Sequence, residues 1–137
     1  MPTTPSAPPR PLEGIKVLDL SRVLAGPWST QILADFGADV IKIELPGNGD
    51  DTRAWGPPNL IGPDGQPEMG ESAYYLCANR NKRSAAINLA HPEGAALIRK
   101  LAAEADIIVE NFKVGGLKKY GLDYPSIQAI NPRAVYC

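Results

Sequence analysis

The sequence contains few of the residues that build metal centres and catalytic triads. Among its 137 residues there is one histidine, His91, and there are two cysteines, Cys77 and Cys137, without metal-binding or redox spacing. We therefore predict no metal site and no Ser/His/Asp triad. We interpret both cysteines as free thiols in a reducing, cytoplasmic compartment, with Cys77 packed in a helix. Because His91 directly precedes Pro92, we expect it to cap a helix rather than to act in catalysis.

Long apolar runs and a strong net charge are also absent. No apolar stretch approaches the length of a transmembrane helix, which argues against a membrane protein. The start, MPTTPSAPPRP, is rich in proline and lacks the apolar segment of a secretory signal, so we interpret residues 1–11 as a disordered lead-in. The formal net charge of −1 gives no reason to expect a nucleic-acid partner.

Two nucleotide-binding motifs are missing as well. The sequence contains neither GxGxxG nor GxxxxGKS/T, which argues against a standard dinucleotide or ATP site. Ala25-Gly26-Pro27 still forms a tight turn before a predicted helix, and the backbone N–H groups of a helix start attract phosphate or carboxylate. Such turns also serve packing, so this signal is weak by itself.

The sequence does contain short β-branched runs that alternate with helical patterns. Strands are predicted over residues 15–20, 39–44, 84–89, 106–110 and from 134 onward, and helices over 27–36, 72–81 and 91–105, with short helical pieces over 115–120 and 124–130. In the helix over 91–105, Leu97 and Leu101 are expected on the apolar side. This alternation predicts an α/β fold of Rossmann-like type, a parallel sheet with flanking helices. Ligands of such sheets bind at the carboxyl ends of the strands, which places the candidate loops at 21–26, 45–70, 90–91 and 111–116.

The segment 45–70 contains six glycines and five prolines. This density predicts a long surface loop without a helix or a central strand. Asp50 and Asp51 stand next to each other in it, but nothing fixes the separation of adjacent loop carboxylates. We therefore expect salt bridging or turn formation from them rather than acid/base catalysis.

Positive charge gathers in the second half of the chain. Between Arg80 and Lys119 there are eight basic and four acidic residues. The run Arg80, Lys82 and Arg83 has the character of a binding site for a diphosphate or a 3′-phosphate. The alternative is a solvated connection between a helix and a strand.

Asn111 and Phe112 follow the fourth predicted strand, where the sheet topology places ligands. An asparagine can hydrogen-bond the polar edge of a ligand, and a phenylalanine can stack on a flat ring. The residues alone leave a second interpretation open, in which Asn111 is a turn residue and Phe112 belongs to the core.

Taken together, these segments resemble the N-terminal part of the class III coenzyme A transferases. The family includes formyl-CoA, carnitine and dicarboxylate CoA transferases and the related α-methylacyl-CoA racemases. The matching stretches begin with PLEGIKVLDLSRVLAGPWSTQILADFGADVIKIE and continue, in family order, through GDDTRAWGPP, SAYYLCANRNKRSAAINL, HPEGAALIRKLAAEADIIVENF, GLKKYGLDY and NPRAVYC. GDDTRAWGPP is most similar to the dicarboxylate branch, which includes succinyl- and glutaryl-type transferases.

The resemblance implies a Rossmann-like domain, here incomplete, over residues 12–137 and an intertwined homodimer when the enzyme is complete. It also implies a ping-pong reaction between an acyl-CoA and a carboxylic acid, in which an aspartate carboxylate attacks the thioester. The family's nucleophilic aspartate lies beyond Cys137, so we expect this chain alone to be inactive. None of the following falls at the catalytic position: Asp19, Asp35, Asp39, Asp50, Asp51, Asp64, Asp106 and Asp123.

The resemblance also implies which residues contact coenzyme A. The family's contacts fall on Val23, Ile87, Asn111, Phe112 and Lys119. Phe112 would flank the adenine, and Lys119 would meet a phosphate at a position where arginine is common.

Two positions depart from the family pattern. Leu45 and Ala90 stand where basic residues occur in other members, which removes two possible phosphate contacts. Arg80, Lys82 and Arg83 are the cations that would compensate.

Three alternatives remain open from the sequence. The chain could belong to an α-methylacyl-CoA racemase, although GDDTRAWGPP favours a transferase. It could be a non-catalytic truncated product or a CoA-binding fragment. The remainder of the enzyme could also be supplied by a second chain.

Overall fold

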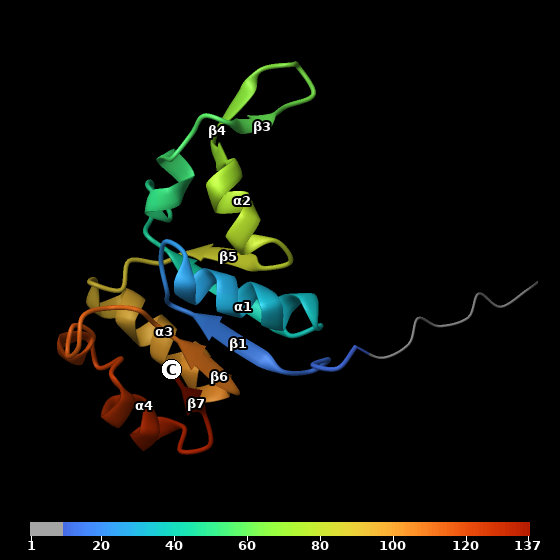
Figure 1. Ribbon diagram of the computed structural model, residues 1–137. Helices are drawn as coiled ribbons and strands as arrows, with labels where there is room; N and C mark the ends of the chain where they lie inside the picture. The colour runs from blue at the N-terminus through green and yellow to red at the C-terminus, as the bar shows by residue number, and fades with distance from the viewer. Residues whose placement is uncertain (1–9) are drawn as a thin grey trace, which may run out of the picture.

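The computed structural model describes residues 10–137 (Figure 1). The predicted disordered lead-in, residues 1–11, lies outside the described residues except for Arg10 and Pro11. Pro11 begins a turn, and the carbonyl of Arg10 accepts a hydrogen bond from the Glu13 N–H at 3.1 Å. Within residues 10–137, no helix is long and apolar enough to cross a bilayer.

The centre of the molecule is a five-stranded parallel sheet, as the sequence predicts. Its strand order is β5-β2-β1-β6-β7, and every neighbouring pair is parallel. The strands are β1 (Lys16–Asp19), β2 (Asp39–Glu44), β5 (Arg83–Ala86), β6 (Ile107–Val109) and β7 (Val135–Tyr136). The helices are α1 (Ala25–Asp35), α2 (Ala73–Asn79), α3 (Pro92–Glu104) and α4 (Tyr124–Ile130). The α/β fold class is therefore confirmed.

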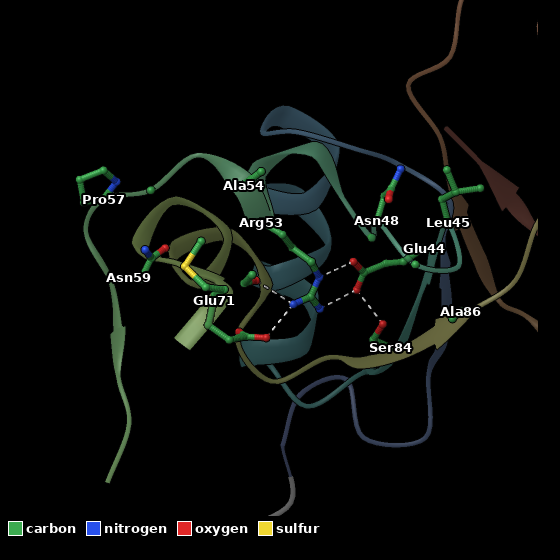
Figure 2. A pocket seen from close by; sticks show the side chains of 15 residues that line it. Glu44, Leu45, Asn48, Arg53, Ala54, Pro57, Asn59, Glu71, Ser84 and Ala86 are labelled. Carbon is green, nitrogen blue, oxygen red and sulfur yellow. Dashed lines mark hydrogen bonds and ion pairs between the residues drawn. The ribbon is translucent and has the colours of Figure 1, made fainter. Parts of the chain in front are cut away.

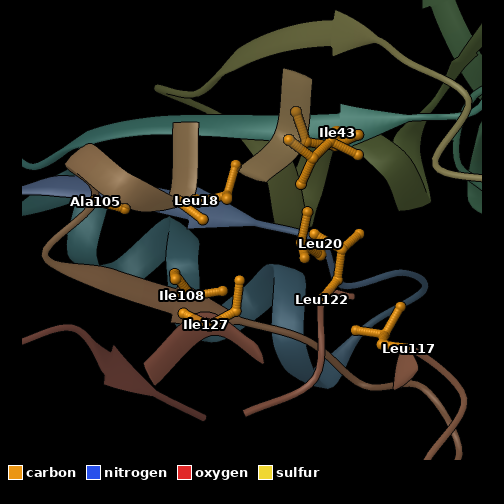
Figure 3. Packing of buried hydrophobic residues seen from close by; sticks show 10 residues of the cluster. Leu18, Leu20, Ile43, Ala105, Ile108, Leu117, Leu122 and Ile127 are labelled. Atoms are coloured by element: carbon orange, nitrogen blue, oxygen red, sulfur yellow. The ribbon is translucent and has the colours of Figure 1, made fainter. Parts of the chain in front are cut away.

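The two faces of the sheet carry separate cores, because successive strand residues point to opposite sides. On one face, Val17 and Val40 pack with Ala34 of α1 and with Ala38. On the other face a larger cluster joins the sheet to α3 and α4 (Figure 3). Its buried members are Leu18, Leu20, Ile43, Ile98, Ala102, Ala105, Ile108, Leu117, Leu122 and Ile127.

The starts of two helices follow from capping side chains. The ring of His91 accepts a hydrogen bond from the Glu93 N–H at 3.3 Å, and Pro92 occupies the first turn of α3. Helix α2 begins in the same manner, because the Ser72 hydroxyl accepts from the Tyr75 N–H at 3.0 Å. The capping role predicted for His91 is confirmed.

The prediction of a long loop over residues 45–70 is wrong in excluding a helix and right in excluding a strand of the main sheet. The segment contains a 3-10 helix, η1 (Asp51–Ala54), and an antiparallel hairpin of β3 (Asn59–Ile61) and β4 (Pro67–Ser72). The hairpin extends away from the main sheet (Figure 1). Glycine and proline exclude a central strand, but they are tolerated in a short exposed hairpin, with Pro67 as the first residue of its strand.

Two details of the predicted helices also differ. Leu97, expected on the apolar side of α3, is half exposed, and Ile98 is the residue that packs into the core. Cys77 lies in α2 as expected, but it is exposed rather than packed. Helix α1 turns Thr30, Gln31 and Ala34 inward.

Candidate functional site

The α1 face of the sheet changes from apolar to charged toward the carboxyl ends of the strands. Along β1 the inward residue is first Val17 and then Asp19, and along β2 it is first Val40 and then Lys42. The side chains of Asp19 and Lys42 are at most 1% exposed. This buried charged layer lies directly beneath the loops that the topology marks for ligand binding.

The first of these loops is fastened by Asn111. The Asn111 side chain accepts from the Arg22 N–H at 2.8 Å and donates to the Arg22 carbonyl at 2.6 Å. The next residue, Val23, has φ +70°, a left-handed conformation that β-branched residues rarely adopt. The loop after β1 is thereby tied to the loop after β6.

The same contacts bring Arg22 onto Phe112. The Arg22 guanidinium carbon lies 5.0 Å from the centroid of the Phe112 ring, within the range of a cation–π interaction. The Phe112 N–H donates to the Glu110 carboxylate at 2.6 Å, which fixes the start of the loop after β6. Phe112 also packs against the larger core cluster, as the second sequence interpretation of this residue expects.

A cavity of about 190 Å³ lies at this edge of the sheet. It is lined mainly by apolar side chains from the ends of the strands and from the loops that follow. Its lining consists of Leu20, Arg22, Ile43, Glu44, Leu45, Gly49, Asp50, Ile87, Asn88, Leu89, Ala90 and Phe112. Two of the predicted contact residues, Ile87 and Phe112, therefore share one cavity, and Asn111 and Val23 adjoin it through Arg22.

The other predicted contact residues do not line this cavity. Lys119 lies in a second 3-10 helix, η2 (Lys118–Tyr120), with its ammonium nitrogen 4.8 Å from the Tyr120 ring centroid. Arg80 pairs with Asp35 at 2.6 Å, and Arg83 pairs with Asp39 at 2.7 Å. Asp39 and Arg83 are the first residues of β2 and β5, so this pair lies at the amino ends of the strands, whereas the cavity lies at their carboxyl ends.

Lys82 is buried on the α1 face. Its ammonium donates to Asp19 Oδ2 at 3.0 Å, to the Pro27 carbonyl at 2.7 Å and to Asn79 Oδ1 at 2.8 Å. These three contacts use all three N–H donors of the side chain. Burial lowers the pKa of Lys82 to about 8, although the charge of Asp19 and its hydrogen bond oppose that effect. Arg80, Lys82 and Arg83 thus each have a protein partner and do not converge on one point.

A second buried pair joins Lys42 to Asp50. The Lys42 ammonium lies 2.9 Å from Asp50 Oδ2 and donates to the Ser21 carbonyl at 2.8 Å. Asp50 also accepts from the N–H and hydroxyl of Thr52, at 3.0 and 2.8 Å. Burial alone would raise the pKa of Asp50, but the Thr52 bonds and the Lys42 charge hold it below its ordinary value. The expected turn and ion-pair role of Asp50 is confirmed.

A larger hollow of about 590 Å³ lies between η1, β4 and β5, around Glu44 and Arg53 (Figure 2). Arg53 donates twice to the Glu44 carboxylate and also to Glu71, the Gly70 carbonyl and the Tyr75 hydroxyl. A guanidinium has five N–H donors, so none remains for a ligand anion. This hollow is therefore a poorer anion site than the smaller cavity.

Arg22 is the cavity residue that sequence reasoning missed. It is exposed, stands on Phe112 and lies 3.8 Å from Asp51. The usable signal is a cation in the first loop after β1, but in the sequence the run from Arg80 to Arg83 is the more prominent basic feature. Among residues 10–137 no cluster of three or more His, Cys, Asp or Glu could hold a metal ion.

Comparison with known proteins decides the family. The model of CoA-transferase family III matches residues 12–137. The chain belongs to CoA-transferase family III. It is 58% identical over 127 residues to the succinate–glutarate CoA-transferase of Agrobacterium fabrum, covering 93% of this chain and 31% of that enzyme. It is 52% identical over 128 residues to the human succinyl-CoA:glutarate CoA-transferase, covering 93% of this chain and 27% of that enzyme.

A solved structure of the family gives the same result for the fold. The chain superposes on a CAIB/BAIF family protein from Brucella suis with a TM-score of 0.87 and 53% sequence identity, covering 95% of this chain and 33% of that one. This family III chain therefore spans about a third of the length of the relatives that it matches.

Proposed function

We propose that this chain supplies the CoA-binding surface of a family III transferase that moves CoA between an acyl-CoA and a carboxylic acid. The observation that carries the proposal is the cavity of about 190 Å³, where Ile87 and Phe112 meet at the carboxyl edge of the sheet. The Phe112 ring has one side in the core and another toward the cavity, so it can stack on the adenine of CoA. Arg22 adds an exposed cation beside that ring for a phosphate group.

The proposed acids are dicarboxylates. The relatives from Agrobacterium fabrum and human carry succinate and glutarate in their names, and the similarity includes the segment GDDTRAWGPP. The reported relatives are transferases, which favours CoA transfer over the racemase alternative. Lys119 remains a proposed phosphate contact. Arg80, Lys82 and Arg83 are proposed contacts too, but each is paired with an aspartate that it would have to share with the phosphate or release.

The chemistry of transfer needs a nucleophilic carboxylate, and we propose that it lies outside this chain. Asp19 and Asp50 are the buried aspartates near the cavity, and both are engaged by lysines and by hydrogen bonds from the protein. The proposed partner is the remainder of the enzyme, either continuous with this chain or on a second one, and the proposed assembly is an intertwined homodimer located in the cytoplasm. The pure 137-residue chain should transfer no CoA from succinyl-CoA to glutarate, and turnover by it would contradict this proposal.

Calorimetric titration of the chain with CoA tests the binding surface. Phe112→Ala should weaken binding by about tenfold, which is the effect of losing one base–aromatic stack. The other phenylalanine of the sequence offers a matched control: Phe36 is half exposed at the far end of α1. Phe36→Ala should leave the affinity unchanged. Equal effects of the two substitutions, or no CoA binding by the unmodified chain, would refute the proposed surface.

A chimaera tests the transferase function. In the Agrobacterium fabrum enzyme, the 127 matching residues are replaced by those of this chain. The chimaera should transfer CoA from succinyl-CoA to glutarate, and Phe112→Ala should raise its KM for succinyl-CoA more than it lowers kcat. A folded chimaera with the oligomeric state of its parent but without transfer would favour the non-catalytic alternative.

A further inference from the structure

We infer that the buried Lys42–Asp50 pair is a positioning device for the first loop of the CoA site. This inference rests on the proposed function and assigns a role to two residues that do not touch the ligand themselves. Asp50 is among the residues around the cavity, but the side chains of Lys42 and Asp50 are only 1% and 0% exposed, so we assign neither side chain a direct contact with CoA. Their contacts run instead to the backbone of the loop after β1.

The pair holds the loop from both ends. Lys42 donates to the Ser21 carbonyl at 2.8 Å, and both carboxylate oxygens of Asp50 lie within 3.3 Å of the Val23 nitrogen and accept its N–H. Between them, the side chain of Asn111 binds the N–H and the carbonyl of Arg22. Three successive residues of the loop are therefore held by side chains from three separate parts of the chain.

The conformation of Val23 shows why such a hold is needed. A valine at φ +70° is strained, and strain of this kind persists only where the surroundings over-determine it. The N–H of Val23 points at a buried anion, which favours the strained conformer over the relaxed one. That conformer also sets the direction of the Arg22 side chain, which stands on Phe112 at the cavity.

Stability alone gives no reason for the pair. A buried ion pair costs desolvation energy that its mutual attraction only roughly repays, and well-packed apolar side chains are often equally stable. The pair differs from an apolar replacement in its hydrogen bonds, which reach the Ser21 carbonyl and the Val23 N–H of the loop, and Thr52 at the start of η1. We therefore assign its role to the loop rather than to the core.

Asp50→Asn is the first test. One amide oxygen can still accept from Thr52, cap η1 and keep the 3.3 Å contact to the Val23 nitrogen. The NH₂ group, however, replaces the oxygen that faces the Lys42 ammonium and the Val23 N–H, which are both donors. In CoA titrations of the full chain, the affinity should fall by about tenfold, the effect of releasing a strained backbone conformer. In a Val23→Gly background the same change should cost less than about threefold, because glycine adopts positive φ without help.

The background comparison separates positioning from a general loss of structure. An equal loss of affinity in both backgrounds would overturn the inference, and so would an unchanged affinity of Asp50→Asn. No CoA binding by the unmodified chain would refute the proposed function instead.

Two further measurements decide the matter if Asp50→Asn does not fold. The double replacement Lys42→Met with Asp50→Leu removes both charges and should keep the fold while weakening CoA binding. Wild-type affinity in that folded variant would overturn the inference. In the unmodified, CoA-free chain, the Val23 amide should already exchange slowly with solvent. Fast exchange that slows only after CoA is added would also overturn it, because the loop would then be ordered by the ligand.

Discussion

Glu44→Gln should make the stability of the protein less dependent on pH in the acid range. The Glu44 carboxylate accepts from Asp50 N–H at 2.8 Å, Tyr75 hydroxyl at 2.9 Å and Ser84 hydroxyl at 2.6 Å, and it pairs with Arg53 at 2.7 Å. Glutamine has nearly the same shape but carries no charge, and its NH₂ group faces these donors. The perturbation therefore removes the charge and leaves the packing in place.

The size of the effect follows from the pKa of Glu44. Burial alone would raise that pKa, but the hydrogen bonds from Arg53, Ser84, Asp50 and Tyr75 outweigh burial and lower it from 4.5 to about 2. A group with a lowered folded-state pKa stabilises the fold fully above its unfolded pKa and loses that contribution as the pH falls through the folded one. Glu44 thus contributes about 3 kcal/mol at neutral pH, most of which disappears between pH 4.5 and about 2.

Urea denaturation of the chain at several values between pH 6 and pH 3 measures this contribution. The difference in unfolding free energy between wild type and Glu44→Gln should narrow by about 2 kcal/mol over that interval. Asp35 and Asp50 also have lowered pKa values, but they are present in both proteins and cancel in the difference. Glu68→Gln, an exposed position on β4, is the control and should show a constant difference. A difference between wild type and Glu44→Gln that stays constant from pH 6 to pH 3 would refute this reasoning.

Three further substitutions test other parts of the structure. Ile98→Ala should lower the unfolding free energy by about 2–5 kcal/mol in urea titrations, because Ile98 is fully buried in the larger core. Its neighbour Leu97 is half exposed, so Leu97→Ala is the control and should change the unfolding free energy by less than about 0.5 kcal/mol. Asn111→Ala should speed hydrogen exchange at the Arg22 amide and weaken CoA binding about two- to tenfold, and an unchanged exchange rate would contradict the clamp. Arg83→Gln should cost less than about 0.5 kcal/mol of stability, since its ion pair is exposed, while a clear loss of CoA affinity would support the predicted phosphate contact.

The fold was predictable because its signals are local. Ile15 to Leu20 and Asp39 to Glu44 have the short β-branched pattern of buried strands, and helices with glycine or proline boundaries lie between the strands. The sequence does not reveal the β3–β4 hairpin, because the glycines and prolines of this segment hide a short exposed pairing in which Ile61 lies opposite Pro67. Leu97 was placed on the wrong side of α3 because adjacent apolar residues leave the helix face ambiguous.

The candidate site was only partly predictable, because its charges find partners far along the chain. Asn111 and Phe112 were identified from their place after a strand, and the structure puts Phe112 in the cavity. The sequence groups Lys82 with its neighbours Arg80 and Arg83, but its partner Asp19 is 63 residues away and directs the Lys82 side chain into the interior. A run of cations in the sequence does not reveal that each cation already has a carboxylate.

The alternation of apolar and charged side chains along β2 nevertheless contains information about how the site is built. In Asp39–Glu44, the residues on the α3 face, Ile41 and Ile43, remain apolar, while those on the α1 face change from Val40 to Lys42 and Glu44. The α3 face can therefore provide the apolar floor of the cavity, and the α1 face can hold the surrounding loops through buried charges. Since one strand serves both purposes, a shift of β2 by one residue would turn Lys42 and Glu44 toward the apolar α3 face and separate Lys42 from Asp50 in the same step. The register of β2 thus couples the stability of the sheet to the shape of the proposed binding site.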